Sequence, residues 1–277
     1  MLTDYHVHLR RDDLGPATTA KRVFTPENAD RYRTVATERG IDELGVSEHI
    51  YRFAQALNVW QHPFWRMQAV DDLDAYCGFV RDETDLRLGI EADFVVGAED
   101  RMASLLESYP WDYVVGSVHF LRDASLDTDD YSVWGRGESP DRVWRRYFDT
   151  VAASALSGLY DLIAHPDLVK YWGDPARRPD KDLRYFYEPA VEAFADSGVA
   201  VEVSTAGLRK PVAEIYPARP FLEMVVDAGC PLALSSDAHT PNQLGYRYEH
   251  ALELLDELGV RELRVFARRQ RRMEPIG

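Results

Sequence analysis

Short apolar runs that stop at a histidine or an acidic residue recur along the sequence, and stretches with helical character separate them. This alternation predicts a parallel sheet or barrel with helices outside it. Because such a barrel commonly takes about 250 residues, we expect a single α/β domain over residues 1–277. Seven runs are clear, and six of them end at His, Glu or Asp: residues 2–8, 43–47, 86–90, 113–118, 162–164, 200–204 and 231–236.

The stretches between these runs carry helix signals. Thr25 before Pro26, and Ser139 before Pro140, supply an N-cap residue and a first-turn proline. The aromatic segment 51–65 is too irregular for one helix and is a candidate lid, with core packing as the alternative. The predicted helices cover residues 26–40, 67–81, 99–107, 140–158 and 181–197, a segment ending at Gly229, and 248–258, and residues 263–266 are a candidate eighth strand.

Charge and composition exclude several classes of protein. A net charge of −15 disfavours broad contact with nucleic acid, whose phosphates favour a basic surface. No apolar stretch approaches the roughly 18 residues that a membrane helix needs. Without a secretory signal, and with only Cys77 and Cys230, we expect a cytoplasmic protein without a disulfide framework. An arginine-rich tail is expected to pair with the acidic body: Arg261, Arg264, Arg268, Arg269, Arg271 and Arg272.

The positions of the histidines indicate a metal site. His6 and His8 project from the same face of an extended strand and make half of such a site. In a parallel barrel the carboxyl ends of all strands share one face, so ligands far apart in sequence become neighbours. Taken singly, His165 could be a capped turn and Glu91 a surface carboxylate. Six of the eight histidines lie at strand ends, and the expected metal ligands there are His6, His8, His49, Glu91, His119, His165, Asp237 and His239.

These motifs resemble those of the polymerase-and-histidinol-phosphatase (PHP) superfamily over nearly the whole chain. The segment 202–211 further resembles its histidinol-phosphatase branch. The segments that carry the superfamily resemblance are His6-Val7-His8, Ser47-Glu48-His49, Gly89-Ile90-Glu91, Gly116-Ser117-Val118-His119, Ala164-His165-Pro166 and Ser236-Asp237-Ala238-His239.

The resemblance implies a distorted (β/α)7 TIM-like barrel with a metal site at the C-terminal ends of its strands. It assigns one metal to His6, His8, Glu91 and Asp237. Glu91 would bridge this metal to a second one, which His119 and His165 would also hold. A third metal would take His49 and His239. The family usually adds another ligand to this metal soon after the first histidine pair. Here Asp13, or else Asp12, is expected to replace that ligand, or the third site is weak or empty. Asp4 would orient a ligating imidazole, or simply be a polar residue at a strand start.

Two or three divalent ions, zinc, iron or manganese, would suit mixed imidazole and carboxylate ligands without cysteine. Their positive charge favours a phosphate monoester, activates water and stabilises the leaving alkoxide. Arg209 and Lys210 are expected to bind the phosphate. Glu91, Asp237 and His239 are the predicted catalytic residues. A metal-bound water, or Asp237 or His239 if either is loosely held, is the expected proton source for the product alcohol. No serine or cysteine nucleophile motif is evident.

The first interpretation is therefore hydrolysis of L-histidinol phosphate in histidine biosynthesis. A second keeps the metal centre and changes the substrate to another small phosphoester or a nucleotide. A nucleic-acid-processing module and a non-catalytic metal-stabilised scaffold are the remaining alternatives. We expect a small phosphorylated substrate as partner, with neither nucleic acid nor membrane, and the sequence predicts no particular oligomeric state.

Overall fold

Seven parallel strands form the centre of the computed structural model, which describes residues 1–11, 14 and 22–277. Each strand pairs with the next along the chain, so the spatial order follows the sequence. The strands are β1 (Thr3–Asp4), β2 (Glu43–His49), β3 (Arg87–Asp93), β4 (Tyr113–Ser117), β7 (Leu162–Ile163), β8 (Ala200–Ser204) and β9 (Leu232–Ser235).

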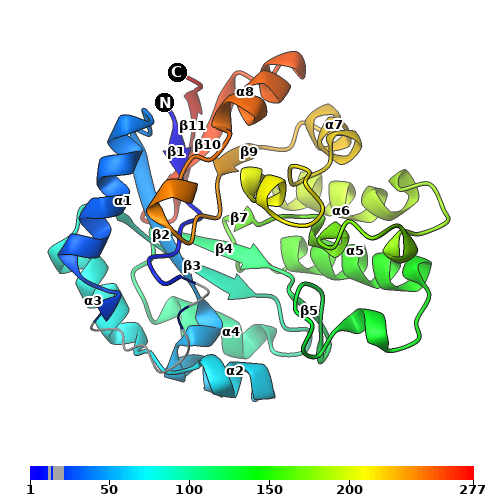
Figure 1. Cartoon of the computed structure of the whole chain (residues 1–277), viewed down its shortest axis with the longest axis horizontal. Coiled ribbons are helices and arrows are strands. Elements are labelled where there is room, and N and C mark those ends of the chain that lie inside the picture. Colours follow the sequence, from blue (N-terminus) through cyan, green and yellow to red (C-terminus); the bar gives the residue numbers. More distant parts are fainter. Residues whose placement is uncertain (12–13, 15–21) are drawn as a thin grey trace.

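A backbone bridge between Val7 and Ala238 joins the segments that follow β1 and β9, the two outermost strands of this order. The sheet is therefore a nearly closed barrel, which confirms the predicted α/β (β/α)7 fold. Figure 1 shows the helices arranged around the central strands, with the two chain ends side by side. These helices are α1 (Pro26–Glu38), α2 (Pro63–Gln68), α3 (Leu73–Glu83), α4 (Glu99–Glu107), α5 (Pro140–Leu156), α6 (Arg184–Ser197), α7 (Arg219–Asp227) and α8 (Tyr248–Glu257).

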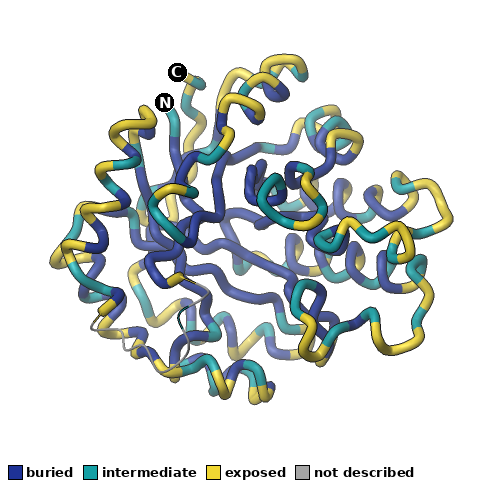
Figure 2. Tube along the Cα trace, in the orientation of Figure 1, coloured by how far each residue is buried: buried dark blue, intermediate teal, exposed yellow. Residues whose placement is uncertain are grey.

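The barrel interior follows the two-residue alternation of its strands. In β8, Val201 and Val203 pack in the outer core with the helices, whereas Ala200 lies in an inner cluster with Tyr113. A Cβ at Gly89 would collide with the Tyr113 ring, so glycine there admits the aromatic side chain. Burial is continuous along the central strands and stops at the outer faces of the helices (Figure 2).

One predicted helix differs from the structure. The helix expected over 67–81 is divided between α2 and α3, because Asp72 ends the intervening segment and caps α3 by accepting a hydrogen bond from the Ala75 N–H at 2.9 Å. The expected irregularity of residues 51–65 is confirmed, since they form the short 3₁₀ helices η2 (Ile50–Arg52) and η3 (Ala54–Asn58) before α2.

The candidate eighth strand lies outside the barrel sheet. It is β10 (Glu262–Ala267), which forms an antiparallel hairpin with β11 (Gln270–Pro275). Phe266 from this hairpin packs against Tyr5 and Tyr113 of the inner cluster. Arg269 and Arg271 of the tail each lie 2.9 Å from a carboxylate oxygen of Asp161, so part of the basic tail does pair with an acidic residue of the barrel.

Both cysteines are unpaired and buried. Within the part of the chain that the structure describes, no helix has the length and apolar character required to cross a bilayer.

Candidate functional site

The eight predicted ligands within the described residues converge at the carboxyl ends of the strands. Each is at most 8% exposed, although six different strands and their following loops supply them. Asp12 and Asp13, expected as alternative ligands of a third metal, lie outside the described residues. The residues brought together are His6, His8, His49, Glu91, His119, His165, Asp237 and His239.

Glu91 lies at the centre, and its two carboxylate oxygens face different imidazoles. Oε2 lies 2.5 Å from His49 Nδ1, 3.3 Å from His6 Nε2 and 3.5 Å from His8 Nε2. Oε1 lies 3.2 Å from His165 Nε2 and 3.4 Å from His119 Nε2. Glu91 therefore presents oxygens to imidazoles on both of its sides.

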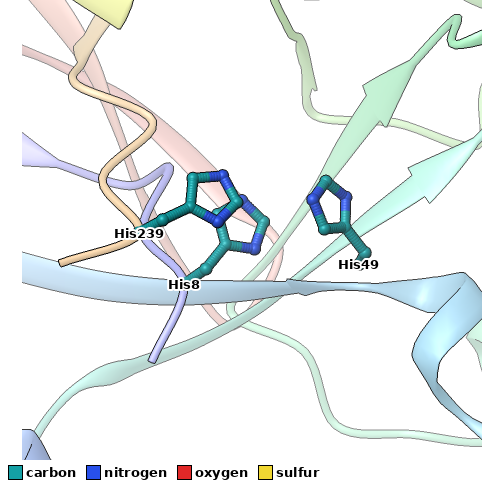
Figure 3. A group of neighbouring side chains, drawn as sticks. All are labelled: His8, His49 and His239. Atoms are coloured by element: carbon teal, nitrogen blue, oxygen red, sulfur yellow. The ribbon is translucent and has the colours of Figure 1, made fainter. Parts of the chain in front are cut away.

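Asp237 and His239 complete the cluster from the loop after β9. Asp237 Oδ1 lies 3.5 Å from His8 Nε2 and 3.1 Å from His239 Nε2. His8, His49 and His239 form a further group whose ring nitrogens lie within 4.8 Å of one another. Figure 3 shows these three imidazoles, which come from three separate segments of the chain.

The residues fit divalent metal ions. For ligand atoms about 2.1 Å from a metal, neighbouring ligand atoms lie about 3.0 to 3.4 Å apart in octahedral or tetrahedral geometry. Four of the five separations around Glu91 are close to these values. His6 Nε2, His8 Nε2 and Glu91 Oε2 are buried without a hydrogen-bond partner. Buried polar atoms of this kind are costly unless a partner satisfies them, and a cation is a partner that all three could share.

The histidines of the cluster differ in how readily they carry a positive charge. Burial opposes a positive charge on His119, but the carboxylates of Asp93 and Glu91 outweigh it and raise the pKa of His119 to about 10. Burial and the neighbouring His239 lower the pKa of His8 to about 4. Because only a neutral imidazole nitrogen can bind a metal, His8 is already in the binding form and His119 must release a proton.

Two carboxylates that orient the imidazoles escaped the sequence analysis. Asp93 lies 2.8 Å from His119 Nδ1, and Glu202 lies 2.8 Å from His6 Nδ1. The available signal was periodicity, since Asp93 follows Glu91 by two residues in β3 and therefore shares its face. Glu202 is an acidic residue within an otherwise apolar buried strand.

Of the two roles left open for Asp4, orienting an imidazole is not the one that its contacts support. Its carboxylate accepts hydrogen bonds from Ser236 N at 3.0 Å, from Ser236 Oγ at 2.5 Å and from Gly245 N at 3.3 Å. It therefore holds the loop that carries Asp237, whose backbone has the unusual φ of 49°. Asp4 acts on the loop instead of on a ligand ring.

A cavity of about 310 Å³ opens above the cluster. Its floor includes His49, His119, His165, Asp237 and His239. Tyr51 and Phe64, from the predicted lid, line it, whereas Phe53 and Trp65 of the same segment are buried in the core. The other described lining residues are Arg10, Leu14, Arg52, Gln68, Phe120, Ser125, Asp127, Thr128, Leu168, Tyr171, Lys210 and Tyr216.

The two predicted phosphate ligands have different positions. Lys210 lines the cavity, and its ammonium lies 5.8 Å from the centre of the Tyr171 ring. Arg209 lies behind the wall, where its Nη2 donates hydrogen bonds to the carbonyl oxygens of Ser236 and Asp237, both at 2.9 Å. Arg209 Nη1 is buried without a hydrogen-bond partner.

Comparisons with known proteins agree with this fold. Residues 27–206 match the family described as PHP domain. A Deinococcus radiodurans protein named "Probable histidinol-phosphatase" is 32% identical over 281 residues, which cover 99% of each chain. The Bacillus subtilis "Histidinol-phosphatase" is 29% identical over 188 residues, covering 62% of this chain and 70% of its own.

A solved structure shares the architecture. The crystal structure of histidinol phosphate phosphatase from Lactococcus lactis, complexed with zinc, L-histidinol and phosphate, superposes with a TM-score of 0.70 at 17% identity and covers 98% of each chain. At that identity the likeness shows the fold alone. The family match and the full-length relative show that this chain belongs to the PHP domain family.

Proposed function

We propose that this protein is a metal-dependent phosphatase that hydrolyses L-histidinol phosphate to L-histidinol and phosphate. The observation that carries the proposal is Glu91, whose two oxygens face five histidines beneath an open cavity. The names of the relatives point to the same reaction. The unpaired cysteines suit the reducing cytoplasm, where we place the protein.

Two or three divalent ions would occupy the cluster. His6, His8, Glu91 and Asp237 would hold one, and Glu91, His119 and His165 a second. His49 and His239 would hold a third, with Asp13 as the proposed additional ligand. Zinc is present in the Lactococcus structure, and the same mixture of imidazole and carboxylate ligands also suits manganese or iron.

The residues around the cluster fit the three parts of the substrate. Bound cations would supply charge that binds the phosphate and Lewis acidity that activates water. Lys210 adds a positive charge from the wall, and we keep Arg209 as a second candidate through its unpaired Nη1. Tyr51, which stacks on His49 with ring centres 4.6 Å apart, and Phe64 offer aromatic surfaces to an imidazole.

Asp127 is our candidate for binding the substrate ammonium group. Within the described lining it is the carboxylate that lies outside the proposed ligand set, and Ser125 Oγ donates a hydrogen bond to it at 3.1 Å. For proton transfer we propose His239 as the source for the leaving alcohol oxygen, with its Nε2 held 3.1 Å from Oδ1 of the ionised Asp237. Glu91 would act by holding the cluster together.

A substrate panel tests the proposal. We expect kcat/KM for L-histidinol phosphate to exceed the values for sugar phosphates and nucleotides, and activity to disappear with a chelator and return with zinc, manganese or iron. A higher kcat/KM for another phosphoester would keep the metal centre and support the alternative substrate. Full activity in the presence of a chelator, with no metal by elemental analysis, would contradict the mechanism itself.

A further inference from the structure

We infer that Glu202 is a positioning residue that fixes two proposed metal ligands, His6 and His165, at the same time. This inference rests on the proposed function. Glu202 lies in β8, and its side chain is completely buried. It contacts neither the cavity nor the substrate position, so it would act through its neighbours.

Three hydrogen-bond donors from different segments converge on this carboxylate. Oε1 faces His6 Nδ1 at 2.8 Å and accepts a hydrogen bond from Ser235 Oγ. Oε2 accepts a hydrogen bond from the backbone N–H of His165 at 2.6 Å. His6 follows β1, Ser235 ends β9 and His165 follows β7. One side chain therefore links segments on both sides of β8.

The contact with His6 determines which ring nitrogen carries the proton. An ionised carboxylate can only accept hydrogen bonds, so His6 Nδ1 must be the donor. The lone pair is then on Nε2, which lies 3.3 Å from Glu91 Oε2 and has no hydrogen-bond partner. Such an outer carboxylate fixes both the tautomer and the direction of a ligating imidazole.

The contact with His165 supports an unfavourable backbone conformation. The φ of His165 is 27°, in the region that residues other than glycine rarely adopt. Conformations of this kind are unfavourable and persist only where surrounding contacts enforce them. By accepting the His165 N–H, Glu202 stabilises the turn that directs Nε2 to 3.2 Å from Glu91 Oε1. Glu202 therefore sets ligands on both sides of Glu91.

Replacement of Glu202 by glutamine separates this role from simple packing. Glutamine has nearly the same shape, but one of its two polar atoms is an amide nitrogen that donates. If the nitrogen faces His6, it forces the proton onto Nε2. If it faces His165, two N–H groups oppose each other. Glu188→Gln makes the same chemical change on an exposed position of α6 and serves as the matched control.

The test compares metal content and affinity in the wild type and in both variants. For Glu202→Gln we expect metal affinity to fall roughly 10- to 100-fold. We also expect kcat to fall with KM nearly unchanged, because the cavity walls keep their residues. Glu188→Gln should match the wild type. Equal metal affinity and kcat in Glu202→Gln and wild type would overturn the inference, whereas a wild type that binds no divalent metal would overturn the proposed function.

A spectroscopic measurement covers the case in which Glu202→Gln does not fold. In the metal-loaded wild type labelled with ¹⁵N-histidine, two slowly exchanging Nδ1–H protons are expected, from His6 bonded to Glu202 and from His119 bonded to Asp93. Asp93→Asn should remove one of them and leave the other. If Asp93→Asn removes every slowly exchanging imidazole proton, His6 does not donate to Glu202 and the inference is wrong.

Discussion

Val7 pairs with Ala238 and thereby closes the barrel between β1 and β9. The bridge is flanked by two hydrogen bonds, from His8 N to Ala238 O at 2.8 Å and from Ala238 N to His6 O at 3.2 Å. His6 and His8 lie on either side of Val7, and Asp237 and His239 lie on either side of Ala238. The same backbone pairing therefore closes the barrel and brings together half of the candidate metal ligands.

Replacing Asp4 with alanine should weaken this closure. The variant leaves Ser236 N, Ser236 Oγ and Gly245 N without their acceptor. Because unsatisfied buried donors cost about 1–3 kcal/mol each, we expect a lower free energy of unfolding in urea and a reduced metal content. Asp82→Asn, on the exposed face of α3, is the control. Unchanged stability in Asp4→Ala would show that the loop is held by other contacts.

The sequence predicted the positions of the ligands better than their partners. His49, Glu91 and His119 follow apolar runs, and a parallel barrel brings such strand ends to one face whatever the details of packing. Which carboxylate meets which imidazole depends on pairing between strands. Glu202 reaches His6 from a segment 196 residues away, and no local pattern reports that distance. The contacts of Asp4 with Ser236 and Gly245 likewise join segments more than 230 residues apart, so the sequence left its role open.

Secondary structure was missed where a local contact competed with periodicity. Residues 67–81 carry helical character throughout, yet Asp72 makes a better helix start than a helix interior. The run at 263–266 has the residues of a barrel strand. It pairs instead with residues 270–275, since the seven preceding strands already complete the ring through Val7 and Ala238.

Replacing Glu91 with glutamine should disable the whole cluster. Five imidazoles face this carboxylate, and burial alone would favour its protonated form. Because the imidazoles of His49, His6 and His119 outweigh burial, the pKa of Glu91 is held well below its ordinary value. Glutamine removes the negative charge, so we expect kcat to fall by roughly three orders of magnitude.

Elemental analysis of the same variant provides the second measurement. Loss of more than one metal per chain is expected if Glu91 is shared between ions. His250→Gln, which changes a histidine of α8 outside the cluster, is the control for purification and handling. Normal metal stoichiometry in Glu91→Gln would contradict a bridging role.

Asp127→Asn should affect the choice of substrate more than the chemistry. A hydrogen bond to a charged partner contributes about 1.5–3 kcal/mol, so kcat/KM for L-histidinol phosphate is expected to fall at least tenfold, mainly through KM. 4-Nitrophenyl phosphate lacks an ammonium group, and its kcat/KM should change little. An equal loss with both substrates would mean that Asp127 supports the cluster and does not bind the amine.

The Cys77 thiol should be unreactive in the folded protein. Burial raises the pKa of Cys77 to about 12 from an ordinary value near 9. At pH 8 the thiolate fraction then falls to roughly one in ten thousand, whereas in the unfolded chain it is about one in ten. Because the folded pKa is the higher one, this thiol favours the folded state fully below pH 8, and the advantage disappears as pH rises toward 12.

We expect iodoacetamide to alkylate Cys77 in the Cys230→Ser variant roughly a thousandfold more slowly when folded than in urea, as followed by mass spectrometry. Alkylation at the unfolded rate, with an unchanged circular dichroism spectrum, would show that α3 opens without global unfolding and that the packing of Cys77 against the barrel is weaker than its burial indicates.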